Sequence, residues 1–208
     1  MTGELAFMAA PWRPVMALIL ASVVIMGSPG PSTVSATAMG AAFGIRRSLY
    51  YVGGLVLGTI AVLLAVSMGV VALILSMPRA ASALTIVSAA YILYLAFKIA
   101  TAPPLESQGK DVAGPAFAGG FLLAIANPKA YLAIAAVFAG TTLLAERPGL
   151  DATLKVALLS GMIVIIHLFW LIAGASLSRV LRDPTSSRVI NVALAVILVA
   201  MTLAAFVG

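Results

Sequence analysis

The sequence predicts an all-α membrane protein with six transmembrane helices, arranged as two inverted three-helix repeats. Three observations lead to this prediction. Hydrophobic residues make up 63% of the 208 residues and charged residues only 9%, with a mean hydropathy of +1.19. The apolar residues gather in six runs of about the length that a helix needs to cross the hydrocarbon, about 20 residues each. The first and fourth runs are each interrupted at prolines.

The low charge content excludes two broad classes of protein. Average soluble domains are roughly 45–50% apolar and about 25% charged, so this chain cannot cover a water-facing surface. Neither a soluble enzyme nor a disordered chain fits this composition. Transmembrane β-strands alternate apolar and polar residues, whereas these runs are apolar on every side. The chain contains no cysteine, which excludes disulfides and thiol chemistry.

The six predicted helices follow one another with short connections. They cover about residues 14–43, 49–77, 80–100, 114–144, 152–177 and 189–207. Residues 101–113 (TAPPLESQGKDVA) are rich in proline and polar side chains and are predicted to link half-repeats of about 1–100 and 114–208. Residues 1–208 are therefore expected to form a single transmembrane domain. The first apolar run is expected to be retained rather than cleaved as a signal peptide.

Lysine and arginine residues in the loops predict the orientation, because cytoplasmic loops carry an excess of them. The loops after the first, third and fifth helices hold Arg46, Arg47, Lys98, Lys110, Arg179, Arg182 and Arg188. The opposite side holds Arg13, Arg79, Arg147 and Lys155. This excess predicts that both termini lie outside the cytoplasm in a bacterial-type inner membrane. Because the basic residues are scattered singly, no nucleic-acid partner is predicted.

The first break, Ser28-Pro29-Gly30-Pro31, is predicted to lie near the middle of the membrane. Proline removes a backbone donor and clashes with the preceding turn. Backbone groups freed at this depth must be buried in protein or face a wet cavity. The helix that restarts near Ser32 offers free amides and the positive end of its dipole to an anion such as a carboxylate. The hydroxyls of Ser28, Ser32 and Thr33 are further candidate contacts, and a simple kink is the alternative interpretation.

The second break, Asn127-Pro128-Lys129, lies within the fourth run, and Asn127 can cap the helix that restarts there. A charge at that depth costs about 2.5–3.5 kcal/mol or more, so Lys129 needs a partner or a task. Either its ammonium binds a substrate carboxylate or gates transport by protonation, or it satisfies carbonyls freed by the first break. Both alternatives require the two breaks to meet. Tyr131, which follows Lys129, is the best tyrosine candidate for the cavity wall.

The number of helices in each half also points to a function. Three is an odd number, so the two halves cross the membrane in opposite directions. Inverted repeats whose corresponding helices are interrupted are typical of secondary transporters. The sequence therefore predicts alternating access, in which the two halves rock around a site in the middle of the membrane.

Pro29-Gly30-Pro31 in the first helix and Asn127-Pro128-Lys129 in the fourth resemble the L-lysine exporter (LysE/RhtB) superfamily of amino-acid exporters. The segment AAYILYLAFKI, residues 89–99, is similar to the end of that family's third helix. Length, six helices and a central linker also match, so the resemblance covers nearly the whole chain. It implies export of amino acids or related small metabolites, driven by a proton or sodium gradient or by exchange. No enzymatic activity and no cofactor are predicted.

The resemblance has one departure, which concerns acidic residues. All six acids are expected in loops or tails: Glu4, Glu106, Asp111, Glu146, Asp151 and Asp183. Members of the family often carry an acidic residue within the membrane, for instance in the fifth helix, where this sequence reads IVIIHLFWLIAG. A carboxylate would suit a cationic substrate. Its absence makes a neutral amino acid, or another uncharged or anionic metabolite, the favoured substrate.

His167 is the only histidine and lies near the middle of the fifth predicted helix. Histidine titrates near pH 6.5, so His167 either couples transport to protons or is a neutral group hydrogen-bonded inside the bundle. Trp170, three residues on, shares its helix face and either walls the substrate cavity or packs in the core. No metal site is predicted, because no second histidine, cysteine or intramembrane acid is available.

Two other functions stay open. One is export of another small molecule or ion on the same scaffold, and the other is a membrane assembly subunit that transports nothing. The expected partners are the lipid bilayer, a small-molecule substrate and a coupling ion, preferably H⁺. A homo-oligomer is left open as well.

Overall fold

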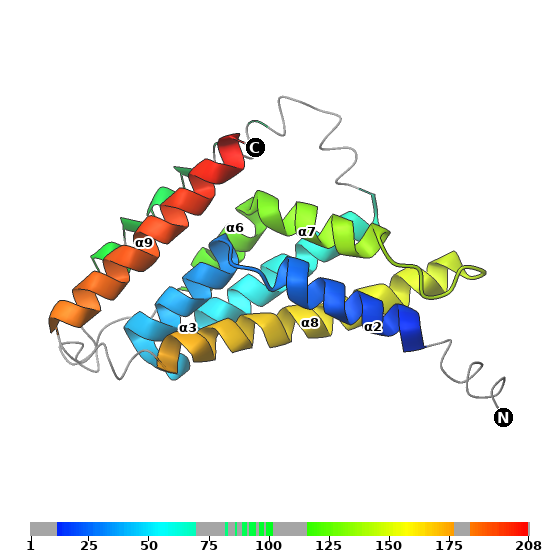
Figure 1. Ribbon diagram of the computed structural model, residues 1–208, viewed down its shortest axis with the longest axis horizontal. Coiled ribbons are helices and arrows are strands. Elements are labelled where there is room, and N and C mark those ends of the chain that lie inside the picture. Colours follow the sequence, from blue (N-terminus) through cyan, green and yellow to red (C-terminus); the bar gives the residue numbers. More distant parts are fainter. Residues whose placement is uncertain are drawn as a thin grey trace.

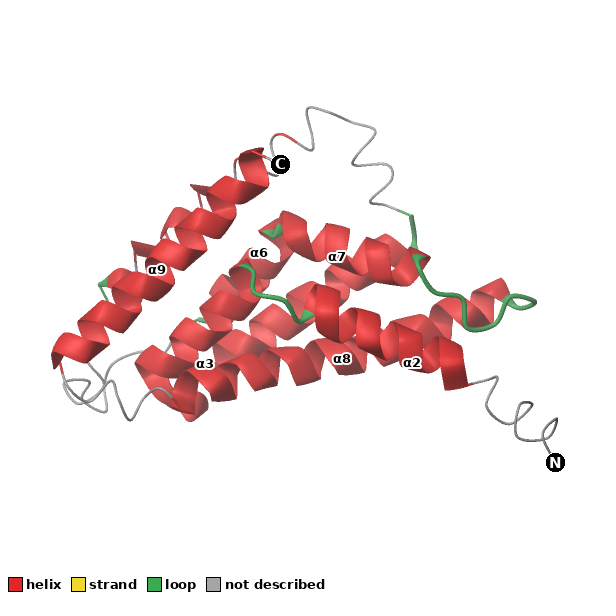
Figure 2. Ribbon diagram, in the orientation of Figure 1, coloured by secondary structure: helices red, strands yellow, loops and turns green. Residues whose placement is uncertain are grey.

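The computed structural model describes residues 12–69, 82, 86, 89, 90, 92–94, 96, 97, 99–101, 116–176 and 184–207. Within this part of the chain all secondary structure is helical (Figures 1 and 2). The labelled elements are α2 (Trp12–Ala21), a π-helical turn η1 (Ser22–Met26), α3 (Pro31–Ser67), α6 (Phe117–Ala126), α7 (Pro128–Ala139), α8 (Pro148–Ser176) and α9 (Pro184–Val207).

The long helices have the dimensions of membrane spans. α3 and α8 are each long and apolar enough to cross a membrane, and α6 and α7, which meet at a bend of 63°, form a third candidate span. The chain is therefore an all-helical membrane protein, as the composition predicts. Ten of the 21 residues of the predicted third helix, and all but Thr101 of the predicted linker, lie outside the described residues.

The boundary between the first two predicted helices differs from the expectation. Instead of a loop near residues 44–48, α3 continues to Ser67, and only Gly44 leaves helical geometry, with φ 72° and ψ 172°. Glycine adopts a positive φ at little cost, so this one residue is enough to kink the helix. Arg46 and Arg47 consequently lie within the helix that continues after the kink, not in a loop.

Two other helices begin earlier than expected. α8 starts at Pro148 and α9 at Pro184, ahead of the predicted starts near 152 and 189. The predicted starts followed the onset of apolar residues. Proline, with its fixed φ and missing N–H, is well suited to the first turn of a helix, and here it precedes the apolar stretch by several residues.

α3 is the central helix, and it contacts its neighbours through glycines. A Cβ atom at Gly54 would collide with the carbonyl oxygen of Phe117 in α6, and one at Gly120 with that of Tyr51 in α3. A Cβ atom at Gly174 in α8 would collide with the carbonyl oxygen of Thr37. Small residues at these points let the helix backbones touch directly.

Two apolar clusters complete the core. One joins α3, α6, α8 and α9 with Ile92, and it includes Tyr51, Leu55, Leu123, Leu171 and Leu198. The other joins α2, α3, α7 and α8 and includes Leu18, Leu63, Ile134, Leu159 and Ile163. α9, drawn from orange to red in Figure 1, lies along one side of the bundle. The second cluster holds α7 and α8 near η1, and this packing brings the two chain interruptions together.

Candidate functional site

The first interruption comprises residues 27–30, between η1 and α3. Pro31 is the first residue of α3, and Gly30 before it is extended. The hydroxyl oxygen Oγ1 of Thr33 accepts a hydrogen bond from the N–H of Gly30 at 2.8 Å. The amides of Ser32 and Thr33 lie in the first turn, where an N–H has no carbonyl partner within its own helix. The start of α3 therefore presents donors.

The second interruption is Asn127, the residue between α6 and α7. Its Oδ1 accepts a hydrogen bond from the N–H of Lys129 at 3.2 Å, which caps α7 as the sequence predicts. Its Nδ2 donates to Oγ of Ser32 at 2.9 Å, and the residue is only 3% exposed. One amide side chain thus joins the starts of α7 and α3.

Lys129 connects the interruptions a second time. Its Nζ donates to the carbonyl oxygen and Oγ of Ser28, both at 2.8 Å, and to the carbonyl oxygen of Pro29 at 2.5 Å. Gly30 makes room for this contact, because a Cβ atom there would lie 2.7 Å from Cδ and 2.9 Å from Nζ of Lys129. In this conformation Lys129 satisfies carbonyl groups of the opposite break, one of the two roles that the sequence leaves open.

A cavity of about 40 Å³ lies where the two interruptions meet. Its polar lining consists of Ser28, Ser32, Thr33, Thr59, Asn127, Lys129 and His167. Its remaining lining consists of Met26, Gly30, Ala130, Ala133, Ile134, Ile163 and Ile166. A buried water needs about 10–15 Å³, so the cavity has room for a few groups of that size. Among the described residues, no carboxylate lines it.

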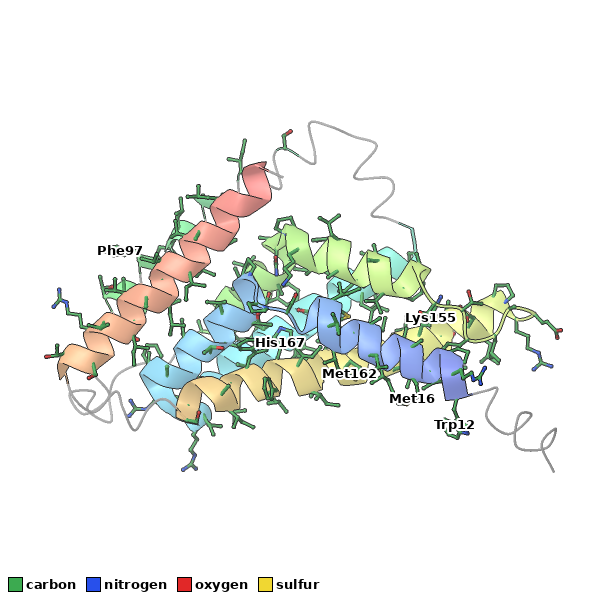
Figure 3. The ribbon with its side chains drawn as sticks, in the orientation of Figure 1. Trp12, Met16, Phe97, Lys155, Met162 and His167 are labelled. Atoms are coloured by element: carbon green, nitrogen blue, oxygen red, sulfur yellow. The ribbon has the colours of Figure 1, made fainter. Side chains whose placement is uncertain are left out.

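His167 lines this cavity and has a buried ring nitrogen without a partner in the described structure. The side chain is 4% exposed, and Nδ1 lies 2.8 Å from the carbonyl oxygen of Ile163. Nε2 is buried and has no hydrogen-bond partner among the described residues. Figure 3 shows His167 in the middle part of α8, with Lys155 toward the other end of the same helix. Among the described residues lining the cavity, His167 and Lys129 are the two that can titrate.

The other predicted site residues lie next to the cavity. Nε1 of Trp170 donates to the carbonyl oxygen of Gly27 at 3.0 Å. The hydroxyl of Tyr131 donates to the carbonyl oxygen of Ile125 at 2.9 Å. Neither side chain is part of the cavity lining. Each binds a carbonyl at the end of a helix, where the backbone oxygens have no partner within the helix. Pro31 and Pro128 are the first residues of α3 and α7, and both shape the backbone there.

The apolar wall is the part of the cavity that sequence reasoning missed. Ile163 and Ile166 precede His167 by four residues and one residue, and Ala130 and Ala133 follow Lys129. Helical spacing from the polar residues is the signal that would have found Ile163 and Ala133, since residues four apart share a helix face. Thr59 also lines the cavity, while its Oγ1 donates to the carbonyl oxygen of Leu55 at 2.7 Å.

The expectation that all acids lie in loops or tails is wrong for Asp151, which forms an ion pair with Lys155. Both lie in α8 and are buried, and their Oδ2 and Nζ atoms are 2.8 Å apart. Nζ of Lys155 also donates to the carbonyl oxygens of Phe138 and Thr141, at 2.9 and 3.0 Å. This ion pair holds the end of α7 to α8. It does not line the cavity.

Comparison with known sequences assigns this chain to a family. The chain matches the model of the LysE type translocator over residues 23–207, which include both interruptions. It is 31% identical over 173 residues to the cysteine/O-acetylserine efflux protein of Escherichia coli O1:K1 / APEC, in an alignment that covers 83% of this chain and 87% of that protein. The efflux proteins of the same name from Escherichia coli strain K12 and Shigella sonnei strain Ss046 are 31% identical over 175 residues, with the same coverage. No solved structure gives a significant match. The chain belongs to the LysE type translocator family.

Proposed function

We propose that this protein is a secondary active exporter of neutral amino acids in a bacterial-type inner membrane. Its relatives are named for efflux of cysteine and O-acetylserine. The observation that carries the proposal is the meeting of two interrupted helices at one cavity, where Lys129 and Asn127 bind the first interruption. Discontinuous helices that meet around a buried polar site are typical of secondary transporters.

The proposed architecture has six transmembrane helices in two inverted three-helix repeats, with both termini outside the cytoplasm. In each half an interrupted segment comes first, namely η1 with the start of α3, and α6 with α7. In both segments the helix after the interruption begins with proline, at Pro31 and Pro128. This similarity supports a common design for the two halves.

The substrate carboxylate is proposed to bind the N–H groups of Ser32 and Thr33 and the ammonium of Lys129. To do so, Lys129 exchanges some of its bonds to Ser28 and Pro29 for bonds to the substrate. Charge-assisted hydrogen bonds of this kind are roughly twice as strong as neutral ones. Because no carboxylate lines the cavity in the described part of the chain, a neutral amino acid is favoured over a cationic one.

Transport is proposed to proceed by alternating access. The cavity of about 40 Å³ must enlarge to admit an amino acid, and rocking of one half against the other provides that opening. His167 is the proposed proton carrier. One charge that crosses 100 mV supplies about 2.3 kcal/mol, and a tenfold concentration ratio requires about 1.4 kcal/mol. One proton therefore supports a ratio above tenfold.

The test is efflux from proteoliposomes loaded with a mixed pool of amino acids, with and without a pH gradient. Mass spectrometry identifies the species that leave, and protein-free liposomes give the leak. We expect one or a few neutral amino acids to leave faster when the gradient is present. If none leaves under either condition, the amino-acid proposal fails, and export of another solute or a subunit role takes its place.

A further inference from the structure

We propose that the substrate ammonium and the coupling proton compete for one atom, Nε2 of His167. The proposal rests on amino-acid export and adds the atom at which exchange with protons takes place. Three observations carry it: the partner of Nδ1, the absence of a partner for Nε2 in the described structure, and the donors on the other polar residues of the cavity.

The first step concerns the tautomer of His167. A backbone carbonyl can only accept, so Nδ1, at 2.8 Å from the carbonyl oxygen of Ile163, carries the hydrogen. In the neutral ring Nε2 is then unprotonated and can only accept a hydrogen bond. Leaving a buried acceptor without a partner is unfavourable, because the atom has lost its hydrogen bonds to water. A hydrogen bond from a donor that enters the cavity to Nε2 is therefore favourable.

The second step concerns the complementarity of the cavity to its ligand. Lys129 and the first amides of α3 are donors, and Nε2 of neutral His167 is an acceptor on a side chain from a different helix. An α-amino acid in its zwitterionic form carries an accepting carboxylate and a donating ammonium. The carboxylate suits Lys129 and α3, and the ammonium suits Nε2. A lone cation or a lone anion satisfies only one of the two.

The third step concerns the proton. Once Nε2 binds a proton it becomes a donor with a positive charge, which neither accepts from an ammonium nor attracts it. When the site opens outward, a proton from outside forms an N–H bond on Nε2 and displaces the substrate. When the site opens inward, that bond breaks, the proton enters the cytoplasm, and Nε2 accepts from the next ammonium. The substrate keeps its own protons throughout.

The groups that face His167 are compatible with this exchange. α7 contributes Lys129 to the lining, and this charged side chain is hydrogen-bonded to Ser28 in the first interruption. From α3 the cavity receives only the hydroxyl residues Ser32, Thr33 and Thr59, and from the η1 side Met26 and Ser28, none of which titrates in the physiological range. Within the described cavity lining, His167 is therefore the one group placed to bind a proton and the substrate ammonium in turn.

The experiment measures proton release when substrate binds. The purified full-length protein in lipid nanodiscs is mixed with O-acetyl-L-serine, which carries no thiol, in weakly buffered solution containing a pH indicator. Titrations cover about pH 5 to pH 8, the range in which histidines titrate. At the acidic end we expect close to one proton released per substrate bound, and an apparent Kd that rises toward tenfold for each unit by which the pH falls.

The variants make the result specific. His167→Gln keeps an accepting oxygen but does not titrate, so it should bind without releasing a proton and with a Kd that does not change with pH. Phe169→Leu, on the same helix at a side chain that is 63% exposed, should release protons as the native protein does.

The outcomes separate the two proposals. Binding by the native protein without proton release, or equal release by His167→Gln, overturns the competition and leaves amino-acid export intact. If the native protein binds none of O-acetyl-L-serine, L-cysteine and L-serine, amino-acid export fails and the competition fails with it. If His167→Gln does not fold, the native titration still tests the proposal, because binding without proton release overturns it.

Discussion

The ammonium of Lys129 lies inside an apolar bundle with all its donors used. It has three N–H groups, and Ser28 and Pro29 supply three oxygens within 2.8 Å. An unpaired charge in a membrane helix costs about 2.5–3.5 kcal/mol or more. The freed carbonyls of one break thus compensate the half-buried charge of the other. Neither half of the chain contains both members of this pair.

Gly30 is the residue that permits this contact, and its substitution tests it. Gly30→Ala is compatible with the extended backbone but places a Cβ atom 2.9 Å from Nζ of Lys129, so the lysine must move away. Hydrogen bonds to charged groups contribute about 1.5–3 kcal/mol, and we expect export to fall by about tenfold or more. Gly161→Ala, which enters open space in α8, is the control. Equal rates for both variants in proteoliposomes would contradict the prediction.

At the scale of whole elements, glycines fix how closely α3 and α6 approach. Gly53 and Gly54 form a matched pair for testing this, because they are adjacent and only the second faces α6. A Cβ atom at Gly54 collides with Phe117, whereas one at Gly53 meets nothing within 4 Å. Overpacking costs typically about 1–3 kcal/mol. We expect Gly54→Ala to lower the melting temperature in detergent by several degrees and Gly53→Ala to leave it unchanged or raise it slightly.

The ion pair at the start of α8 leads to a second prediction at this scale. Asp151→Asn keeps an oxygen for the N–H groups of Leu143 and Leu144 but removes the charge that Lys155 faces. Breaking a buried pair costs about 3–5 kcal/mol. We expect Asp151→Asn to lower the free energy of unfolding by about 2–3 kcal/mol, because Lys155 keeps two carbonyl partners. Export per folded molecule should stay within about twofold.

The control for this variant is Glu146→Gln, which makes the same chemical change at an exposed position nearby. Stability is measured by thermal unfolding and export by proteoliposome flux. A large loss of export at native stability would assign the pair a role in the transport cycle, against this prediction.

Sequence reasoning reached the parts of the molecule that depend on local chemistry. Asn127 was expected to cap a helix and does cap α7, because a cap bonds a donor only a few residues away. Pro31 and Pro128, where the sequence suggests that helices restart, are the first residues of α3 and α7. Sequence reasoning did not find the burial of Asp151 with Lys155, because an apolar pattern assigns the start of a helix only approximately. It also missed the apolar cavity wall, which exists only once four elements have packed together.

The proposed exchange makes a prediction for the molecule as a whole. A zwitterion leaves without net charge and one proton enters, so each cycle carries one positive charge inward. A potential of 100 mV, negative on the cytoplasmic side, then supplies about 2.3 kcal/mol and supports about a fortyfold substrate ratio without any pH gradient. We expect potassium–valinomycin potentials to accelerate export in proteoliposomes. A rate that is independent of voltage would indicate an electroneutral exchange.

Because all three N–H groups of Lys129 are hydrogen-bonded, the chemical reactivity of this lysine reports whether its contact with the first break is intact. An amine reacts with an acylating reagent only when it is unprotonated and its lone pair is accessible. The three hydrogen bonds that Lys129 donates favour its protonated form, which has no free lone pair. When the two halves separate, or a carboxylate displaces Ser28 and Pro29, the reactivity of this lysine changes. Mass spectrometry of pulse-labelled protein, with the ion-paired Lys155 as an internal reference, should show labelling that depends on added substrate. Labelling that is fast and independent of substrate would mean that the contact with the first break does not persist in the membrane.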